Sequence, residues 1–163
     1  MQPLDQKAVR KAFVNASKSR AASATFPQEW PPTGLDDLDF LGWTDPKAPQ
    51  RAYLVVDETV VDQVVAVELR LATSAGSIRK TMCDWCHSQD AGDGARLMVA
   101  PRAGARGKAG DTVGLYVCAD FGCSRRVRVP LKAHQVSVSG APDRRVEELV
   151  ERVRDFVERV REA

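Results

Sequence analysis

The four cysteines and their spacing constrain this sequence more than any other feature. They form two close pairs, Cys83-x2-Cys86 and Cys118-x4-Cys123, which are separated by 31 residues. No signal peptide is visible at the start of the sequence, so we expect a reducing, cytoplasmic location in which disulfides are rare. Two thiol pairs that bracket a predicted hairpin can bind one tetrahedral zinc ion. The sequence therefore predicts one structural zinc (Zn2+) per chain, held by four thiolates.

Other interpretations of the cysteines stay open at this point. A single C-x-x-C can be a thioredoxin-like redox motif, although the βαβ context of that motif is missing here. Four unpaired core cysteines would also fit, because free cysteine is commonly buried. A catalytic zinc site keeps an open position and usually includes a histidine or a carboxylate, whereas all four candidate ligands here are thiols, so we expect a closed site. His87 follows Cys86 and is either a ligand in a swapped set or a surface neighbour.

Length and hydrophobic patterning predict the fold class. The chain has 163 residues, of which 44% are hydrophobic, and this fits a single domain spanning residues 1–163. No apolar run is long enough to cross a bilayer, so we expect no membrane association. Strands are predicted at residues 52–57, 64–72, 96–100 and 112–117. The first two should form an antiparallel hairpin, with the strand at 64–72 half-buried and Glu68 and Arg70 facing outward.

Helices are predicted near both ends of the chain. The first covers residues 5–20, with Asp5 as its cap, and the second covers residues 143–162. On the second helix, charge pairs are expected between Glu148 and Arg152 and between Arg154 and Glu158. Its apolar stripe should pack onto the sheet and contains Val146, Leu149, Val150, Val153, Phe156, Val157 and Val160.

Two further segments are predicted to be irregular. Residues 25–50 contain five prolines, which disfavour long regular elements, and many large apolar side chains. We expect this segment to be an ordered loop packed onto the body of the protein. The Gly-rich basic segment 101–111 is expected to be a solvent-facing hairpin tip that opens no helix. The overall prediction is an α+β fold, a small antiparallel sheet with N- and C-terminal helices.

The positive charge of the chain is concentrated around the cysteines. The net charge is +2, but residues 79–132 alone hold 10 Lys/Arg and 5 Asp/Glu. A basic surface of this kind suits nucleic acid or an acidic protein surface. Arg125, Arg126 and Arg128 directly follow Cys123, and they would either offset the thiolate charge or form a partner-binding face.

A catalytic set is not evident in the sequence. The histidines, His87 and His134, belong to no recognisable nucleophile or base motif, and the known phosphate-binding glycine motifs are missing. We therefore expect that the protein is not an enzyme and has no small-molecule substrate.

Several segments resemble the elongation factor G-binding protein family, whose treble-clef zinc domain lies at the C-terminus of fusidic-acid-resistance proteins. The resemblance covers roughly residues 5–160. The most specific segments are Leu41-Gly42-Trp43 with Asp45-Pro46, and Cys-Ala-Asp-x-x-Cys-Ser at 118–124. The others are NASKSRA (15–21), LDFLGWTDPKAPQRAYLVV (38–56), MCDWC (82–86), LMVAPRAG (97–104) and VGLYVCADFGCSRRVR (113–128).

The resemblance implies a treble-clef-like four-cysteine zinc finger at approximately 79–132, within a single-domain member of the family. It also implies a zinc-binding interaction module that contacts elongation factor G, the ribosome or both, and modulates elongation or factor release. Aromatic and arginine side chains dominate binding hot spots. The predicted partner-binding face consists of Tyr116, Phe121, Arg125, Arg126 and Arg128, with Arg102 and Arg106 from the hairpin tip. The alternative function is an RNA-binding zinc-finger protein.

Overall fold

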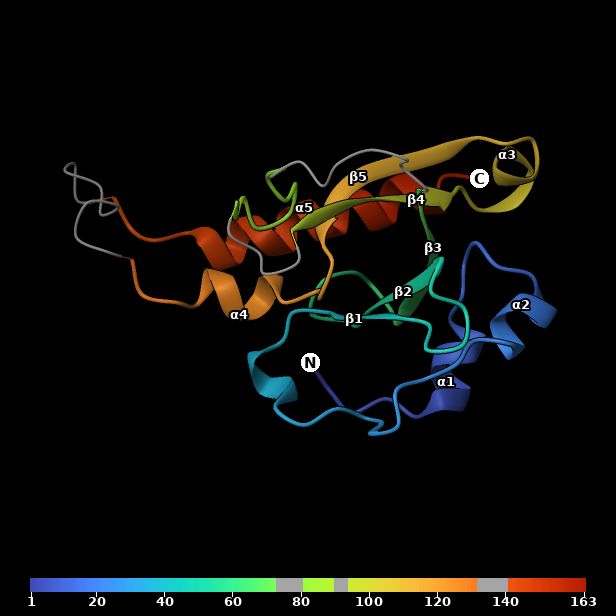
Figure 1. The fold of residues 1–163 in the computed structure, drawn as a ribbon, viewed down its shortest axis with the longest axis horizontal. Helices are drawn as coiled ribbons and strands as arrows, with labels where there is room; N and C mark the ends of the chain where they lie inside the picture. The colour runs from blue at the N-terminus through green and yellow to red at the C-terminus, as the bar shows by residue number, and fades with distance from the viewer. Residues whose placement is uncertain (73–80, 90–93, 132–140) are drawn as a thin grey trace.

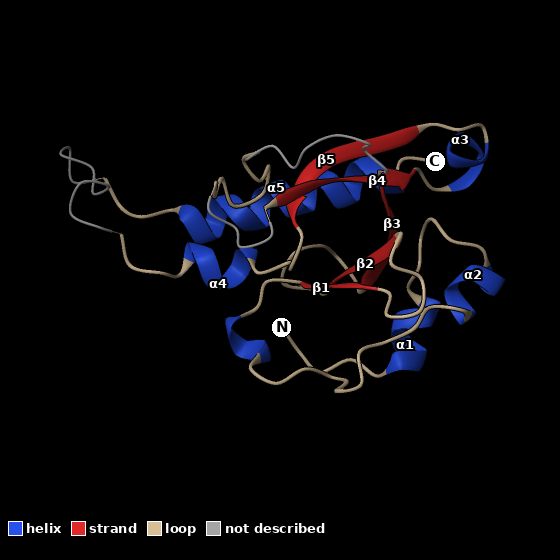
Figure 2. Cartoon of the chain, viewed as in Figure 1, coloured by secondary structure: helices blue, strands red, loops and turns tan. Residues whose placement is uncertain are grey.

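A five-stranded antiparallel sheet forms the centre of the protein in the computed structural model (Figures 1 and 2). The structure describes residues 1–72, 81–89, 94–131 and 141–163. Each strand pairs with its neighbour in the sequence, so the sheet order is β1-β2-β3-β4-β5. The strands are β1 (Leu41–Thr44), β2 (Arg51–Val56), β3 (Val65–Leu71), β4 (Ala95–Pro101) and β5 (Thr112–Cys118). The predicted α+β class, with its antiparallel sheet, is confirmed.

The helices differ greatly in length. The helices are α1 (Gln6–Lys11), α2 (Lys18–Ala22), the 3-10 turn η1 (Leu35–Asp37), α3 (Gly104–Lys108), α4 (Cys123–Val127) and α5 (Arg145–Arg161). The expected stripe of α5 is buried at Leu149, Val153, Phe156, Val157 and Val160. Glu148 and Arg152 form the expected ion pair, at 2.7 Å. Arg154 instead donates to the Val60 carbonyl oxygen at 2.6 Å, and Glu158 pairs with Arg161 at 3.0 Å.

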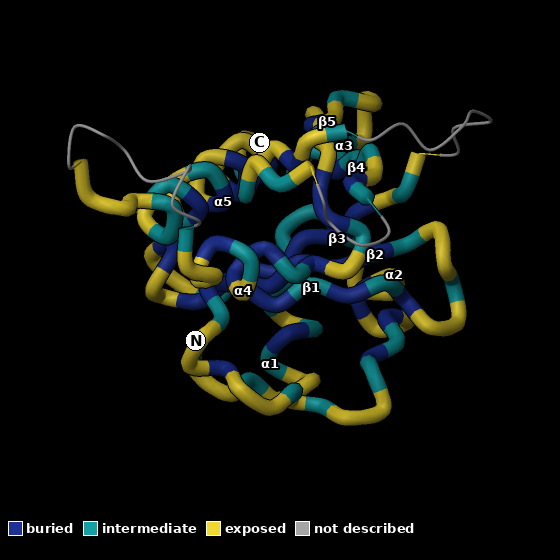
Figure 3. Tube along the Cα trace, turned by 60° about the vertical axis from the view of Figure 1, so that its left-hand side comes forward, coloured by how far each residue is buried: buried dark blue, intermediate teal, exposed yellow. Residues whose placement is uncertain are grey.

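Both faces of the sheet are covered by other parts of the chain. Successive side chains of a strand point to opposite faces, so one strand contributes to both hydrophobic clusters. Leu54 and Val56 of β2 join the cluster that contains α5, whereas Tyr53 and Val55 join the cluster formed with the N-terminal segment. Figure 1 shows α5 on one side of the sheet and α1 and α2 on the other. Buried backbone runs through the middle of the molecule between these two layers (Figure 3).

The prediction that residues 64–72 form a half-buried strand is wrong on one of its faces. Val65 through Leu69 are all buried, and the Glu68 side chain is covered by Arg20 of α2 and Arg51 of β2. Arg20 and Arg51 both bind its carboxylate. Only Arg70 faces solvent as expected. The alternation of apolar and charged residues could not reveal that a second layer covers this face. In a sequence, a glutamate that is buried in an ion pair looks the same as one that faces solvent.

The first predicted helix, residues 5–20, is two short helices in the structure. The Asp5 cap is confirmed, since its side chain accepts from the Ala8 N–H. The first half of β3 pairs with β2 on one side, but its other edge has no partner strand among the described residues, because β4 meets β3 only at Arg70 and Leu71. Residues 12–14 pair with that edge. The Ala66 N–H donates to the Ala12 carbonyl oxygen at 2.9 Å, and the Val14 N–H donates to the Ala66 carbonyl oxygen at 3.0 Å. Hydrogen bonds to the sheet thus replace those of a continuous helix.

Two segments expected to be irregular contain regular elements. Within 25–50, residues 35–37 form η1 and residues 41–44 form β1, which pairs with β2 from Leu41 opposite Val55 to Thr44 opposite Ala52. The prolines misled the prediction because β1 itself lies between Pro32 and Pro46 and contains none. The hairpin tip 101–111 contains the helical turn α3.

The Trp-containing motif that resembles the elongation factor G-binding family builds the second core. Trp43 stacks with Phe26 at a ring separation of 5.1 Å, and Tyr53 packs against Trp43 from the neighbouring strand. The buried Asp45 carboxylate accepts from the Tyr53 hydroxyl at 2.7 Å and from the Thr25 N–H at 3.1 Å. The motif therefore joins β1, β2 and the N-terminal segment.

Tyr53 makes the stability of the fold sensitive to alkaline pH. Burial, and then its hydrogen bond to Asp45, raise the pKa of Tyr53 above its usual range. A group whose folded pKa is raised loses its contribution to stability as the pH rises above its unfolded value, about 10 for tyrosine. We expect the free energy of unfolding to fall from pH 9 to pH 11, and to fall less steeply in Tyr53→Phe. Urea titrations across that range measure both slopes, and parallel slopes would contradict this assignment.

Candidate metal centre

The four cysteine sulfurs meet at one point beside the sheet. All four Sγ atoms lie within 4.8 Å of one another. The Sγ–Sγ distance is 3.7 Å between Cys83 and Cys123 and 3.5 Å between Cys86 and Cys118. These values are far longer than a disulfide bond, which is about 2.05 Å. Cys83, Cys118 and Cys123 are buried and Cys86 is partly exposed, so the cluster is nearly closed to solvent.

The first pair is held by a tight turn that docks onto the last strand. The His87 N–H donates to the Cys83 carbonyl oxygen at 2.8 Å, and His87 takes a left-handed backbone with φ 55°. The Asp84 N–H donates to Tyr116 O at 2.8 Å, and its carboxylate accepts from the Tyr116 N–H at 2.6 Å. The first knuckle is thereby fixed to the outer edge of β5.

The second pair stands at the end of β5 and the start of α4. Cys118 closes the strand, and Cys123 is the first residue of the helix. Between them, the Phe121 N–H donates to the Cys118 carbonyl oxygen at 2.9 Å, with Phe121 at φ 53°. Asp120 accepts from the Gly122 N–H at 3.0 Å. This turn brings two thiols that are five residues apart to the same side of the chain.

The donor set fits a tetrahedral zinc ion. Ligands at a Zn–S distance of about 2.3 Å stand roughly 3.8 Å apart at the corners of a tetrahedron. The observed 3.5 and 3.7 Å separations match that spacing. Four thiolates at this distance require a metal cation, and the chain holds one structural zinc.

Trp85 joins the first knuckle to the core, a role that the sequence analysis did not assign. Its ring is 1% exposed and packs edge-on against Phe40 at 5.1 Å and Phe156 at 5.7 Å. Its carbonyl oxygen accepts from Arg152 of α5 at 2.9 Å. A tryptophan inside a four-residue metal knuckle is the signal that could have pointed to this packing.

Phe121 and Gly42 form a second contact between the metal centre and the sheet. Phe121 is 7% exposed, and a Cβ atom added to Gly42 of β1 would overlap its ring. The glycine of the Leu-Gly-Trp segment therefore makes room for the aromatic residue of the zinc loop. This contact joins two segments that are far apart in the sequence.

The seven residues of the predicted partner-binding face do not form one surface. Arg102 lies just before α3 and Arg106 lies within it, and Figure 1 shows α3 at the opposite end of the β4–β5 hairpin from α4. There they pair with Asp111 at 3.2 Å and 2.7 Å, respectively. Arg102 also pairs with Glu162 near the C-terminus. These two arginines fasten the hairpin tip to the end of α5.

The residues near the cysteines differ in how accessible they are. Phe121 is buried, so its ring packs inside the domain. Arg126 binds the Asp120 carboxylate through both terminal nitrogens, at 2.8 and 2.6 Å, and this hydrogen bonding raises the pKa of Arg126. Arg128 binds Asp39 in the same manner. Arg125 and Tyr116 are exposed.

Knuckle, hairpin and short helix surrounding one metal ion define a treble-clef zinc finger, here built into one edge of a larger sheet. The model of the FBP C-terminal treble-clef zinc-finger family matches residues 8–160, and the chain belongs to this family. Searches of curated proteins and of solved structures found no match. Within the part of the chain that the structure describes, no helix has the length and apolar character needed to cross a membrane.

Proposed function

We propose that this protein is an interaction module whose zinc finger binds elongation factor G or the ribosome and modulates elongation or the release of the factor. The observation that carries the proposal is a pair of exposed apolar side chains at the first knuckle. Met82, directly before Cys83, is 43% exposed, and Tyr116, bonded to Asp84, is 39% exposed. Because a zinc knuckle fixes the backbone, such side chains lose little entropy on binding.

Binding rather than catalysis is the role that we infer for the zinc. Four thiolates fill a tetrahedral coordination shell, so no position is left for water or substrate. A cytoplasmic location goes with this proposal, because translation factors and thiolate zinc sites share that reducing compartment.

RNA is a less favoured partner than protein. Four of the arginines that would contact phosphates, Arg102, Arg106, Arg126 and Arg128, already bind carboxylates of the chain. Phosphate binding would have to compete with those pairs. Met82 and Tyr116 instead supply apolar area, which protein interfaces use.

Arg125→Glu tests the proposal most directly, because Arg125 is exposed in α4 and holds no ion pair among the described residues. We expect its affinity for purified elongation factor G to fall about tenfold at low salt, and less at high salt. Titration by fluorescence anisotropy measures this, with zinc content checked for each protein.

Arg70→Glu is the matched control, since Arg70 is exposed on β3, which is separated from β5 by β4. It should bind as the wild type does. Equal affinities for the wild type, Arg125→Glu and Tyr116→Ala would reject the finger as the contact surface. Tight binding to ribosomal RNA without binding to elongation factor G would favour the RNA alternative.

A further inference from the structure

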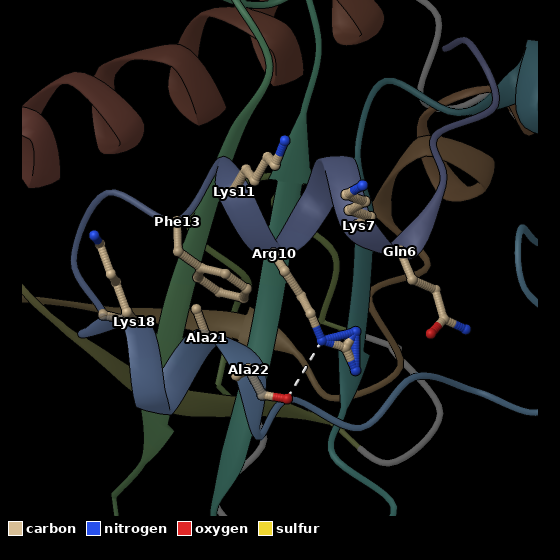
Figure 4. A pocket seen from close by; sticks show the side chains of 9 residues that line it. Gln6, Lys7, Arg10, Lys11, Phe13, Lys18, Ala21 and Ala22 are labelled. Carbon is tan, nitrogen blue, oxygen red and sulfur yellow. Dashed lines mark hydrogen bonds between the residues drawn. The ribbon is translucent and has the colours of Figure 1, made fainter.

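A groove between α1 and α2 lies at the N-terminal layer, outside the zinc finger. Its volume is about 680 Å³. Figure 4 shows Arg10 and Phe13 projecting from the α1 side toward Ala21 and Ala22 of α2. Apolar groups dominate the floor, which consists of Phe13, Ala16, Ala21 and Ala22. A groove of this size and lining can accept an apolar side chain from another molecule.

The rim of this groove is strongly basic. Lys7 and Lys11 stand on α1, and Lys18 stands at the start of α2 (Figure 4). No carboxylate is among the described residues that line the groove. The three lysines form no ion pair with any residue that the structure describes, whereas arginines elsewhere pair repeatedly with carboxylates. Their charge therefore remains available to an anionic partner.

The chemistry of the groove favours a peptide over RNA. Arg10 is the arginine of its lining, and it donates to Ala22 O at 3.3 Å and Ala24 O at 2.9 Å. It also lies over the Phe26 ring at 4.7 Å, so its planar fork is not free for a phosphate. Phe13 packs edge-on against Tyr53 at 5.6 Å and thus is not a free stacking platform for a base.

We propose that this groove binds an acidic segment of a partner protein, with one apolar side chain seated between α1 and α2 and flanking carboxylates on the lysine rim. The lysines belong to two helices on either side of the floor, so they suit several separate negative charges along a peptide rather than a single anionic headgroup. This inference does not depend on elongation factor G being the partner of the zinc finger.

Selection from a displayed library of random 12-residue peptides on the zinc-loaded full chain supplies the probe. We expect enrichment of peptides with Asp or Glu flanking a large apolar residue. The affinity of a labelled selected peptide should fall about tenfold in Lys11→Glu/Lys18→Glu, because charge complementarity is reversed. It should fall similarly in Ala22→Leu, which fills the groove without changing its charge.

The design keeps folding effects apart from binding. Lys18 is the first residue of α2 and Lys11 the last of α1. Glutamate at position 18 therefore interacts favourably with the dipole of α2, whereas glutamate at position 11 interacts unfavourably with the dipole of α1. The two effects on stability have opposite signs. Lys47→Glu/Lys108→Glu, at two exposed lysines elsewhere, should change affinity less than about twofold.

Three results would overturn the proposal. The first is a selection that enriches no peptide over a groove-filled Ala22→Leu counter-target. The second is a selected peptide that binds Ala22→Leu as tightly as it binds the wild type. The third is a 12-nucleotide oligouridine that binds more tightly than any selected peptide and loses affinity in Lys11→Glu/Lys18→Glu, because the groove would then be a phosphate site.

Discussion

Replacing Cys123 with alanine is expected to release the zinc ion and unfold the finger. The variant removes a buried thiolate from the first turn of α4 and leaves three ligands around the metal. Structural zinc contributes directly to folding, at about 10 kcal/mol or more in small fingers. Elemental analysis should find less than stoichiometric zinc, and near-ultraviolet circular dichroism should lose the signal of the packed aromatic residues.

Chelation provides the matched test with an unchanged sequence. Wild-type protein treated with EDTA in reducing buffer should show the same spectral change, and added zinc should reverse it. If Cys123→Ala retained one zinc per chain and unfolded at the urea midpoint of the wild type, the four-thiolate site would be wrong.

Trp85→Ala should produce the second largest effect, a loss of about 3–5 kcal/mol in the free energy of unfolding, which is typical for a buried tryptophan. The truncation leaves Phe40 and Phe156 without their shared neighbour and creates a cavity beside the knuckle. Because the knuckle would then be less well held, the affinity for zinc should also fall. Urea titration and competition with a chromophoric chelator measure the two effects.

Two variants separate packing from metal ligation. Trp85→Phe keeps an aromatic ring in the same place and should lose clearly less stability than Trp85→Ala. Met82→Ala alters an exposed side chain on the same turn and should stay within about 0.5 kcal/mol of the wild type. Equal unfolding midpoints for Trp85→Ala and the wild type would contradict the role of Trp85 in joining the finger to the core.

The metal site was readable from the sequence because its signal is local. Two cysteine pairs around a hairpin nearly determine a ligand set. The alternation at residues 64–72 predicted a strand, although not the burial of its second face, and the apolar stripe at residues 143–162 predicted α5. The break after α1 was not readable. It depends on the free edge of β3, which is free because β4 pairs with β3 only at Arg70 and Leu71. That register is a contact between distant segments, which the local sequence does not show.

The residues of the predicted binding face lie in separate places for a similar reason. Arg102 and Arg126 look alike in a sequence, but their carboxylate partners differ and lie at opposite ends of a hairpin. Phe121 looks like an exposed aromatic residue next to a knuckle, and only the approach of Gly42 from β1 reveals that it is buried. Pairings between distant segments decide which charges and rings remain accessible.

The bonds between Asp84 and Tyr116 give the metal a protective role against self-association. β5 is the last strand of an open sheet, so its outward N–H and C=O groups could pair with a strand from another molecule. The first knuckle covers the backbone N–H and C=O of Tyr116 on that edge, and it keeps its shape because Cys83 and Cys86 share the metal with Cys118 and Cys123. Zinc starvation would uncover the edge, and newly made chains lacking metal would be prone to aggregation before they could be loaded.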